Sequence, residues 1–127
     1  MTDVAARNRR NRRRGADWES ELRDRLREAG FDIERLRLTG KDDEGDHIVR
    51  RPGGRPLIIE AKNATFEPSV FVREAQRERD NYAHHRGLAP ADVDAVAIVR
   101  RRGASWREAY VLTTVAEYFG LPGEVDR

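Results

Sequence analysis

A carboxylate and an ammonium group stand two residues apart in an apolar segment of the chain. The segment Leu57–Asn63 has the sequence LIIEAKN, and the β-branched and aliphatic residues at its start favour a strand. Side chains alternate between the two faces of a strand, so Glu60 and Lys62 share a face. Such a pair on a buried strand is costly unless the groups pair or hold an ion. The alternative is a strand that runs out to a solvated edge, where both side chains are simply exposed.

The identity of the basic residue at position 62 supports a chemical role. Of the 25 basic residues, 23 are arginine and only Lys41 and Lys62 are lysine. A biased genome composition would also produce this excess of arginine. Lysine is a compact charge whose pKa shifts on burial, whereas arginine stays protonated and presents a broad fork. A site that must orient or polarise a water molecule near a metal therefore has reason to use lysine.

A predicted hairpin brings a second carboxylate to the same place. Asp46 stands at the start of a strand predicted over 46–51, 14 residues before Glu60. A Pro-Gly-Gly turn folds that strand back along the next one, so Asp46 lies beside Glu60 and Lys62. Two converging carboxylates form an oxygen-rich site that Mg²⁺ or Mn²⁺ accepts. Taken alone, Asp46 is more simply explained as a turn residue that caps a loop.

A helix predicted over 16–29 supplies a third carboxylate. Apolar residues recur there with helical spacing at Trp18, Leu22 and Leu26. At about 100° per residue, Glu19 falls at the edge of this stripe, so its carboxylate can point along the margin of the core towards the end of a sheet. The alternative is an ordinary solvated helix residue.

Positive charge is concentrated at the N-terminus. Residues 1–14 hold six arginines and one aspartate, whereas the other 113 residues hold 19 basic and 22 acidic side chains, so the two parts carry +5 and −3. The first part cannot bury a core, and we predict a flexible arginine-rich arm over 1–14 and a single domain over 15–127. The arm suits phosphate, although a disordered solubilising tail has the same composition. The candidate DNA contacts in the arm are Arg9, Arg10, Arg12, Arg13 and Arg14.

Composition excludes several other kinds of chemistry. The chain has no cysteine, which excludes a disulfide framework, a thiolate nucleophile and a cysteine zinc site. No apolar run approaches the ~18 to 20 residues of a membrane span, and no apolar stretch follows the arginine tract as in a secretory signal. We therefore expect a cytoplasmic protein without a membrane partner.

The periodicity of the chain predicts an α/β fold in the order αβββαββα, with a central mixed sheet flanked by helices. The expected helices cover 16–29, 68–86 and 114–119. The expected strands cover 31–38, 46–51, 57–62, 94–101 and 109–113.

These motifs, in this order, resemble those of the archaeal-type Holliday junction resolvases of the PD-(D/E)XK nuclease superfamily. In that family a glycine stands four residues before a glutamate in helix one, and Gly15 and Glu19 match this spacing. Gly-Phe ends that helix in the family and stands here at 30–31. The family's Glu-x-Lys matches 60–62. The resemblance covers about residues 12–65 and, beyond them, only the order of elements.

The sequence departs from the family pattern at two positions. Thr39-Gly40 stands where the family's flexible loop carries Ser-Gly, and threonine keeps the hydroxyl group. Gly45-Asp46 stands where the family has Pro-Asp, which changes the residue that leads into the metal-binding aspartate.

The resemblance implies a restriction-endonuclease-like core that hydrolyses four-way DNA junctions by paired symmetric nicks. Asp46 and Glu60 would bind one or two Mg²⁺, for which Mn²⁺ substitutes, and Glu19 would help directly or through a water molecule. Lys62 would orient the attacking water and stabilise charge in the transition state.

The resemblance also implies the partners and the setting, a protein of a prokaryote or of a virus acting in the host cytoplasm, without an organic cofactor. The loop residues Thr39 and Lys41 join the candidate DNA contacts. Resolvases of this family act as two-fold dimers on branched DNA, so a homodimer is expected.

Two other functions stay open on the sequence. A restriction-like or nonspecific nuclease of the same superfamily would use the same residues on duplex, flap or single-stranded DNA. A nucleic-acid-binding module without catalysis would use the carboxylates only as structural groups.

Overall fold

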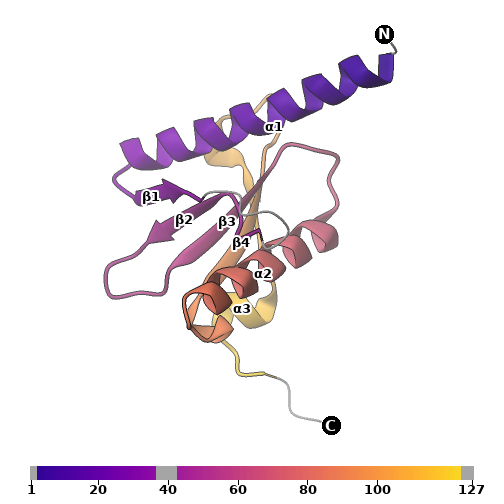
Figure 1. Cartoon of the computed structure of the whole chain (residues 1–127). Coiled ribbons are helices and arrows are strands. Elements are labelled where there is room, and N and C mark those ends of the chain that lie inside the picture. Colours follow the sequence, from indigo (N-terminus) through magenta and orange to yellow (C-terminus); the bar gives the residue numbers. More distant parts are fainter. Residues whose placement is uncertain (1–2, 37–42, 124–127) are drawn as a thin grey trace.

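The computed structural model describes residues 3–36 and 43–123, which form a five-stranded mixed sheet with helices on both faces (Figure 1). The α/β class and the helix-flanked mixed sheet are confirmed. The elements are α1 (Asp3–Glu28), β1 (Asp32–Arg35), β2 (His47–Arg50), β3 (Leu57–Lys62), α2 (Pro68–His85), β4 (Asp94–Val99), β5 (Tyr110–Leu112) and α3 (Val115–Phe119). The order of elements differs from the expected one by two 3-10 helices, Pro90–Asp92 and Trp106–Glu108. None of the described helices is both long and apolar enough to cross a membrane.

Helix α1 begins at Asp3 and not near residue 16, so the described part of the arginine-rich segment continues the helix instead of forming a separate arm. Arginine is a good helix former, and no proline interrupts residues 3–15. Gly15 costs only about 1 kcal/mol relative to alanine within a helix. The buried residues of α1 are Trp18 and Leu22. Only its second half therefore packs on the sheet, and the first half extends past it (Figure 1).

The sheet has the order β1-β2-β3-β4-β5, in which only β3 and β4 run parallel. The predicted hairpin forms with His47 opposite Ile59. Helix α2 connects β3 to β4, and Lys62 lies opposite Val99 at the far end of that pair. The strands are shorter than predicted, and Asp46 directly precedes β2 instead of opening it.

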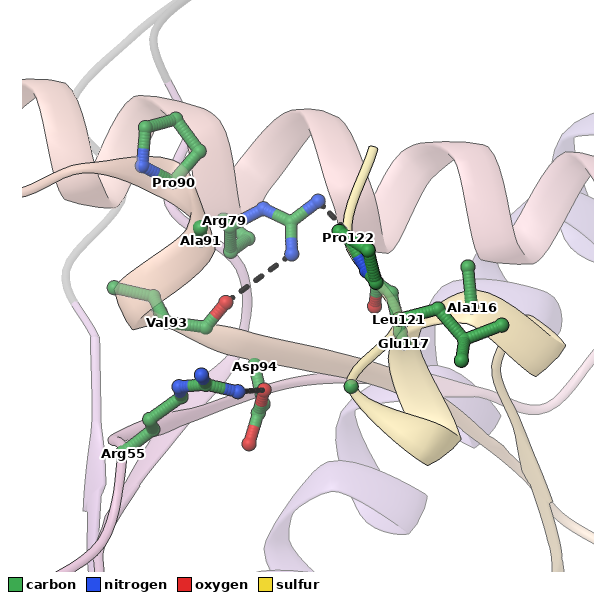
Figure 2. Close-up of a pocket in the computed structure, with 11 residues that line it drawn as sticks. Arg55, Arg79, Pro90, Ala91, Val93, Asp94, Ala116, Glu117, Leu121 and Pro122 are labelled. Carbon is green, nitrogen blue, oxygen red and sulfur yellow. Dashed lines mark hydrogen bonds and ion pairs between the residues drawn. The ribbon is translucent and has the colours of Figure 1, made fainter. Parts of the chain in front are cut away.

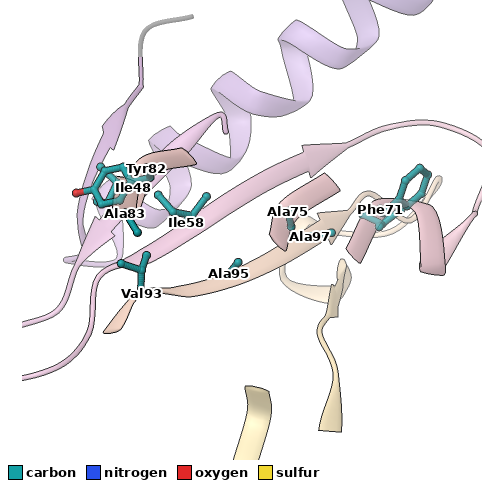
Figure 3. Packing of buried hydrophobic residues seen from close by; sticks show 10 residues of the cluster. Ile48, Ile58, Phe71, Ala75, Tyr82, Ala83, Val93, Ala95 and Ala97 are labelled. Carbon is teal, nitrogen blue, oxygen red and sulfur yellow. The ribbon is translucent and has the colours of Figure 1, made fainter. Parts of the chain in front are cut away.

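The sheet separates two apolar layers. The layer beneath α1 consists of Trp18, Leu22, Ile33, Val49, Ile59 and Ile98. Helix α2 covers the opposite layer, which includes Ile58, Phe71, Ala75, Tyr82 and Ala97 (Figure 3). Because side chains alternate along β3, Ile59 faces α1 whereas Glu60 and Lys62 share the α2 face with Ile58.

We predict that Gly15→Ala raises the free energy of unfolding by about 0.5–1 kcal/mol, because alanine restricts the unfolded chain and favours the helix. A Cβ at this position meets no atom within 4 Å. Urea denaturation followed by circular dichroism measures the change. The matched control is Gly87→Ala, which should lower stability by about 1–2 kcal/mol because Gly87 has φ +66°. No change at Gly15 would contradict a continuous α1.

Candidate functional site

Asp46 extends the pairing of β2 and β3 with its side chain. Its backbone N–H donates to the carbonyl of Ile59 at 3.1 Å, and the N–H of Ala61 donates to its carboxylate Oδ2 at 2.7 Å. The carboxylate thus replaces the carbonyl that a longer β2 would offer. The carbonyl of Asp46 accepts from the N–H of Leu36 at 2.9 Å. These bonds hold the side chain beside the last residues of β3.

Gly45 allows the chain to enter this position. Its φ is +101°, and a Cβ there would lie 2.9 Å from Cγ2 of Ile58 and 3.2 Å from Oε2 of Glu78. Proline is held near φ −65° and cannot adopt this conformation. The glycine therefore lets the backbone before Asp46 pass close to the side chains of Ile58 and Glu78.

Glu60 and Lys62 both face α2, and neither lies on a freely solvated strand end. Glu60 is 7% exposed. The ammonium of Lys62 forms an ion pair with Glu74 of α2 and lies 5.4 Å from the ring centroid of Phe71. The lysine is therefore held on two sides next to Glu60.

Glu78 is a buried acidic residue that the sequence analysis missed. It is 5% exposed, and its Oε2 has no hydrogen-bond partner in the described part of the chain. Carboxylate oxygens of Glu60, Glu74 and Glu78 lie within 4.8 Å of one another. The signal was present in the sequence, because Glu78 shares a helix face with Phe71 and Ala75, at spacings of seven and three residues.

Glu19 approaches Asp46 from α1. Burial raises the pKa of Glu19, and the nearby carboxyl of Asp46 raises it further. The fully buried His47 holds this turn of α1, because its Nε2 donates to the carbonyl of Glu19 at 3.1 Å. Burial lowers the pKa of His47, which disfavours the charged form of the ring. The sequence analysis did not single out this positioning role of His47.

The clustered carboxyl groups cannot all ionise freely. Burial raises the pKa of Asp46 to about 8, with Glu60 adding to the rise, and that of Glu60 to about 9, with Glu78 adding to it. Burial also raises the pKa of Glu78 to about 7. Burial alone would lower the pKa of Lys62, but Glu74, Glu60 and Glu78 outweigh it and raise that pKa. One ammonium group thus faces more carboxylates than it can neutralise.

The donor set fits a hard divalent cation. The candidate ligand groups are the carboxylates of Glu60, Glu74 and Glu78, whose oxygens lie within 4.8 Å of one another, together with Asp46 beside Glu60 and Glu19 beside Asp46. Carboxylate oxygens are preferred ligands of Mg²⁺ and Mn²⁺. The unpartnered Oε2 of Glu78 is an independent indication, because a buried carboxylate oxygen without a partner is costly. A bound cation would balance the negative charge of the carboxylates that Lys62 does not neutralise.

The predicted DNA contacts lie in three places. Arg9, Arg10, Arg12 and Arg13 are exposed on the part of α1 that extends past the sheet. Arg14 lies nearer the site, since its carbonyl accepts from the side-chain amide of Asn63 at 3.4 Å. Thr39 and Lys41 lie outside the described residues.

The hollow drawn in Figure 2 lies at the opposite end of β3 and β4, where the pairing of these strands begins. Its Arg79 pairs with Glu117 at 2.8 Å and donates to the carbonyl of Val93 at 3.1 Å. Its Arg55 lies 3.8 Å from Asp94. Carboxylates pair with both guanidinium groups of this hollow, so it has no excess of charge that would bind an ion. The end of β3 that carries Lys62 does have such an excess.

Comparison with protein-family models finds no match to this chain, and comparison with curated proteins finds none either. A functional assignment therefore rests on the motifs and on the geometry of the carboxylate cluster.

We predict that the metal-free protein loses stability as pH rises from about 5 to about 9. The folded-state pKa values of Asp46, Glu60 and Glu78 are raised above their ordinary values. The folded state therefore binds the protons more tightly, and this stabilisation is lost as pH rises through the raised pKa values. Thermal unfolding in chelator measures the trend, and Mg²⁺ or Mn²⁺ should raise Tm more at the alkaline end.

Glu78→Gln tests the origin of that trend. It should flatten the pH profile in chelator and raise Tm at the alkaline end, because it removes one buried charge. The control is Glu108→Gln at a side chain that is 68% exposed, which should leave the profile unchanged. Stability of the metal-free protein that increases over this pH range would contradict the prediction.

Proposed function

We propose that this chain is a metal-dependent DNA endonuclease of the PD-(D/E)XK type that resolves four-way junctions. The observation that carries the proposal is the meeting of Asp46, Glu60 and Lys62 at one end of β3, with more buried carboxylate than the lysine neutralises. The reaction and the junction substrate come from the resemblance in motifs to archaeal-type resolvases. The geometry supports them, because the three motif residues lie together.

The residues of the cluster have separate roles in this proposal. Asp46 and Glu60 would hold the metal ion, and Glu19 would assist from α1. When bound, the ion supplies Lewis acidity and lowers the pKa of a water molecule. The ammonium of Lys62, which Glu74 directs, orients the attacking water and stabilises negative charge on the phosphate.

The proposed reaction is hydrolysis of one phosphodiester bond. The oxygen of water forms a new bond to phosphorus and loses a proton, and the bond from phosphorus to the 3′ oxygen breaks. The 3′ oxygen takes up a proton. The products are a 5′-phosphate and a 3′-hydroxyl, so no oxidant or organic cofactor is needed.

The basic half of α1 supports branched DNA as the substrate. At about 100° per residue, the arginines between positions 9 and 14 cover about 200° of the helix circumference, a face broader than one narrow stripe. A helix with so broad a cationic face that extends past the sheet can contact phosphates of two DNA arms (Figure 1). Such contacts select shape and do not need base recognition.

Paired symmetric nicks require two catalytic centres related by a two-fold axis. The described residues contain one Asp46–Glu60–Lys62 centre, so we propose that a homodimer is the active form.

The decisive experiment compares cleavage of a labelled synthetic four-way junction and a matched linear duplex, with Mg²⁺ and with chelator. We expect paired nicks on the junction only, and their loss in chelator. Asp46→Asn, Glu60→Gln and Lys62→Ala should each lower the rate by about 10²-fold or more. The matched control Glu108→Gln, at an exposed site, should cut at the wild-type rate.

Two outcomes would overturn the junction-resolving proposal in different ways. Equal cutting of junction and duplex would indicate a general nuclease acting on duplex, flap or single-stranded DNA. Tight binding in chelator with no cutting in Mg²⁺ or Mn²⁺ would indicate a binding module in which Glu60 and Lys62 form a structural pair.

A further inference from the structure

A basic hollow lies directly beyond the end of β3 that carries Lys62. It has a volume of about 230 Å³ and is lined by Arg14, Asn63, Arg100, Arg102 and Gly103. Asn63 follows Lys62, and Arg100 follows the strand position that lies opposite Lys62 in β4. The hollow and the carboxylate cluster therefore share one end of the sheet. A water molecule occupies about 30 Å³ in the liquid, so the hollow has room for a phosphate group and several waters.

Hydrogen bonds between three elements form the frame of the hollow. The amide of Asn63 donates to the carbonyl of Arg14 at 3.4 Å, which connects α1 to the end of β3. The N–H of Arg100 donates to the carbonyl of Lys62 at 2.9 Å, which connects β4 to the same point. Gly103 has φ +75° and turns the chain after β4. The backbone of Arg14 and of Arg100 is thus held at the end of β3, and the exposed Arg102 stands in the turn that follows β4.

Within the described part of the chain, the charges around the hollow have no carboxylate counter-ion. Over residues 3–36 and 43–123, no carboxylate lies within 4.0 Å of the guanidinium of Arg14, Arg100 or Arg102. By contrast, Arg101 lies 4.0 Å from Glu108 and 5.0 Å from the ring centroid of Tyr110. Three guanidinium groups around one hollow repel one another unless an anion lies between them. Their fork geometry matches phosphate oxygens.

We propose that this hollow binds a phosphate of the DNA backbone next to the bond that is cut. The inference rests on the proposed nuclease function and adds a binding site to it. A phosphate held there by Arg14, Arg100 and Arg102 positions the strand, so that the neighbouring phosphodiester lies against Lys62 and Glu60. These arginines are positioning residues, since they contact a phosphate that does not react.

The test is the double substitution Arg100→Ala and Arg102→Ala in the full chain. Fluorescence anisotropy with a labelled four-way junction, in chelator and over a range of salt concentrations, measures binding without cleavage. We expect the affinity to fall about tenfold, and the slope of log affinity against log salt to fall in magnitude by about 1, as for one lost phosphate contact. Under Mg²⁺, KM should rise more than kcat falls.

The matched control removes the same charge at the other end of the sheet. Arg50 and Arg55 are about half exposed and lie near the β2–β3 turn, so Arg50→Ala with Arg55→Ala should change the salt slope by less than half as much. Arg100→Lys with Arg102→Lys keeps the charge and should restore most of the slope but only part of the affinity. Circular dichroism and Tm verify that each variant is folded.

The outcomes separate this inference from the proposed function. Wild-type cleavage of the junction, with binding unchanged in Arg100→Ala/Arg102→Ala, would overturn the phosphate site alone. An equal loss of binding in both alanine pairs would also overturn it, because net charge would then explain the effect. Wild-type binding that depends on the two arginines, without any cleavage, would support the phosphate site and overturn the nuclease.

Discussion

The hydrogen bond from the N–H of Ala61 to the carboxylate of Asp46 determines where the proposed chemistry of this protein would occur. It places an acidic side chain in the position of a strand carbonyl, at the point where β2 stops pairing with β3. Glu60 precedes Ala61 and Lys62 follows it, so this one bond brings all three motif residues to the same end of β3. The backbone bond from Asp46 to Ile59 holds the register.

The cluster built on this bond is unfavourable for stability without a counter-ion. Three carboxyl groups with raised pKa values lie between a sheet and a helix, where water cannot screen them well. Natural proteins tolerate such clusters mainly at functional sites. Lys62 removes only part of the excess charge. The same burial that costs stability would strengthen the binding of a cation and of the phosphate it contacts.

Helix α1 connects the parts of the molecule that the proposed activity needs. Its buried face, with Trp18 and Leu22, packs on the sheet and carries Glu19 to the cluster. One turn before that face, Arg14 lines the basic hollow, and the remaining arginines extend past the sheet. One helix thus carries Glu19, Arg14 and the arginines that extend past the sheet. DNA bound to the arginines would therefore be held at a set position relative to the carboxylates.

The sequence by itself determined the α/β class and the convergence of Asp46, Glu60 and Lys62, because strand alternation and a tight turn are local properties. Tertiary structure decided the rest. Glu78 becomes a member of the site only because α2 packs on the face of β3 that carries Glu60, and one helix pattern does not show which strand it will cover. The basic hollow needs the ends of α1, β3 and β4 together, so Arg14 alone could not reveal it. The extent of α1 was also missed, because an arginine-rich composition is shared by disordered segments and by helices, and only the folded chain distinguishes them.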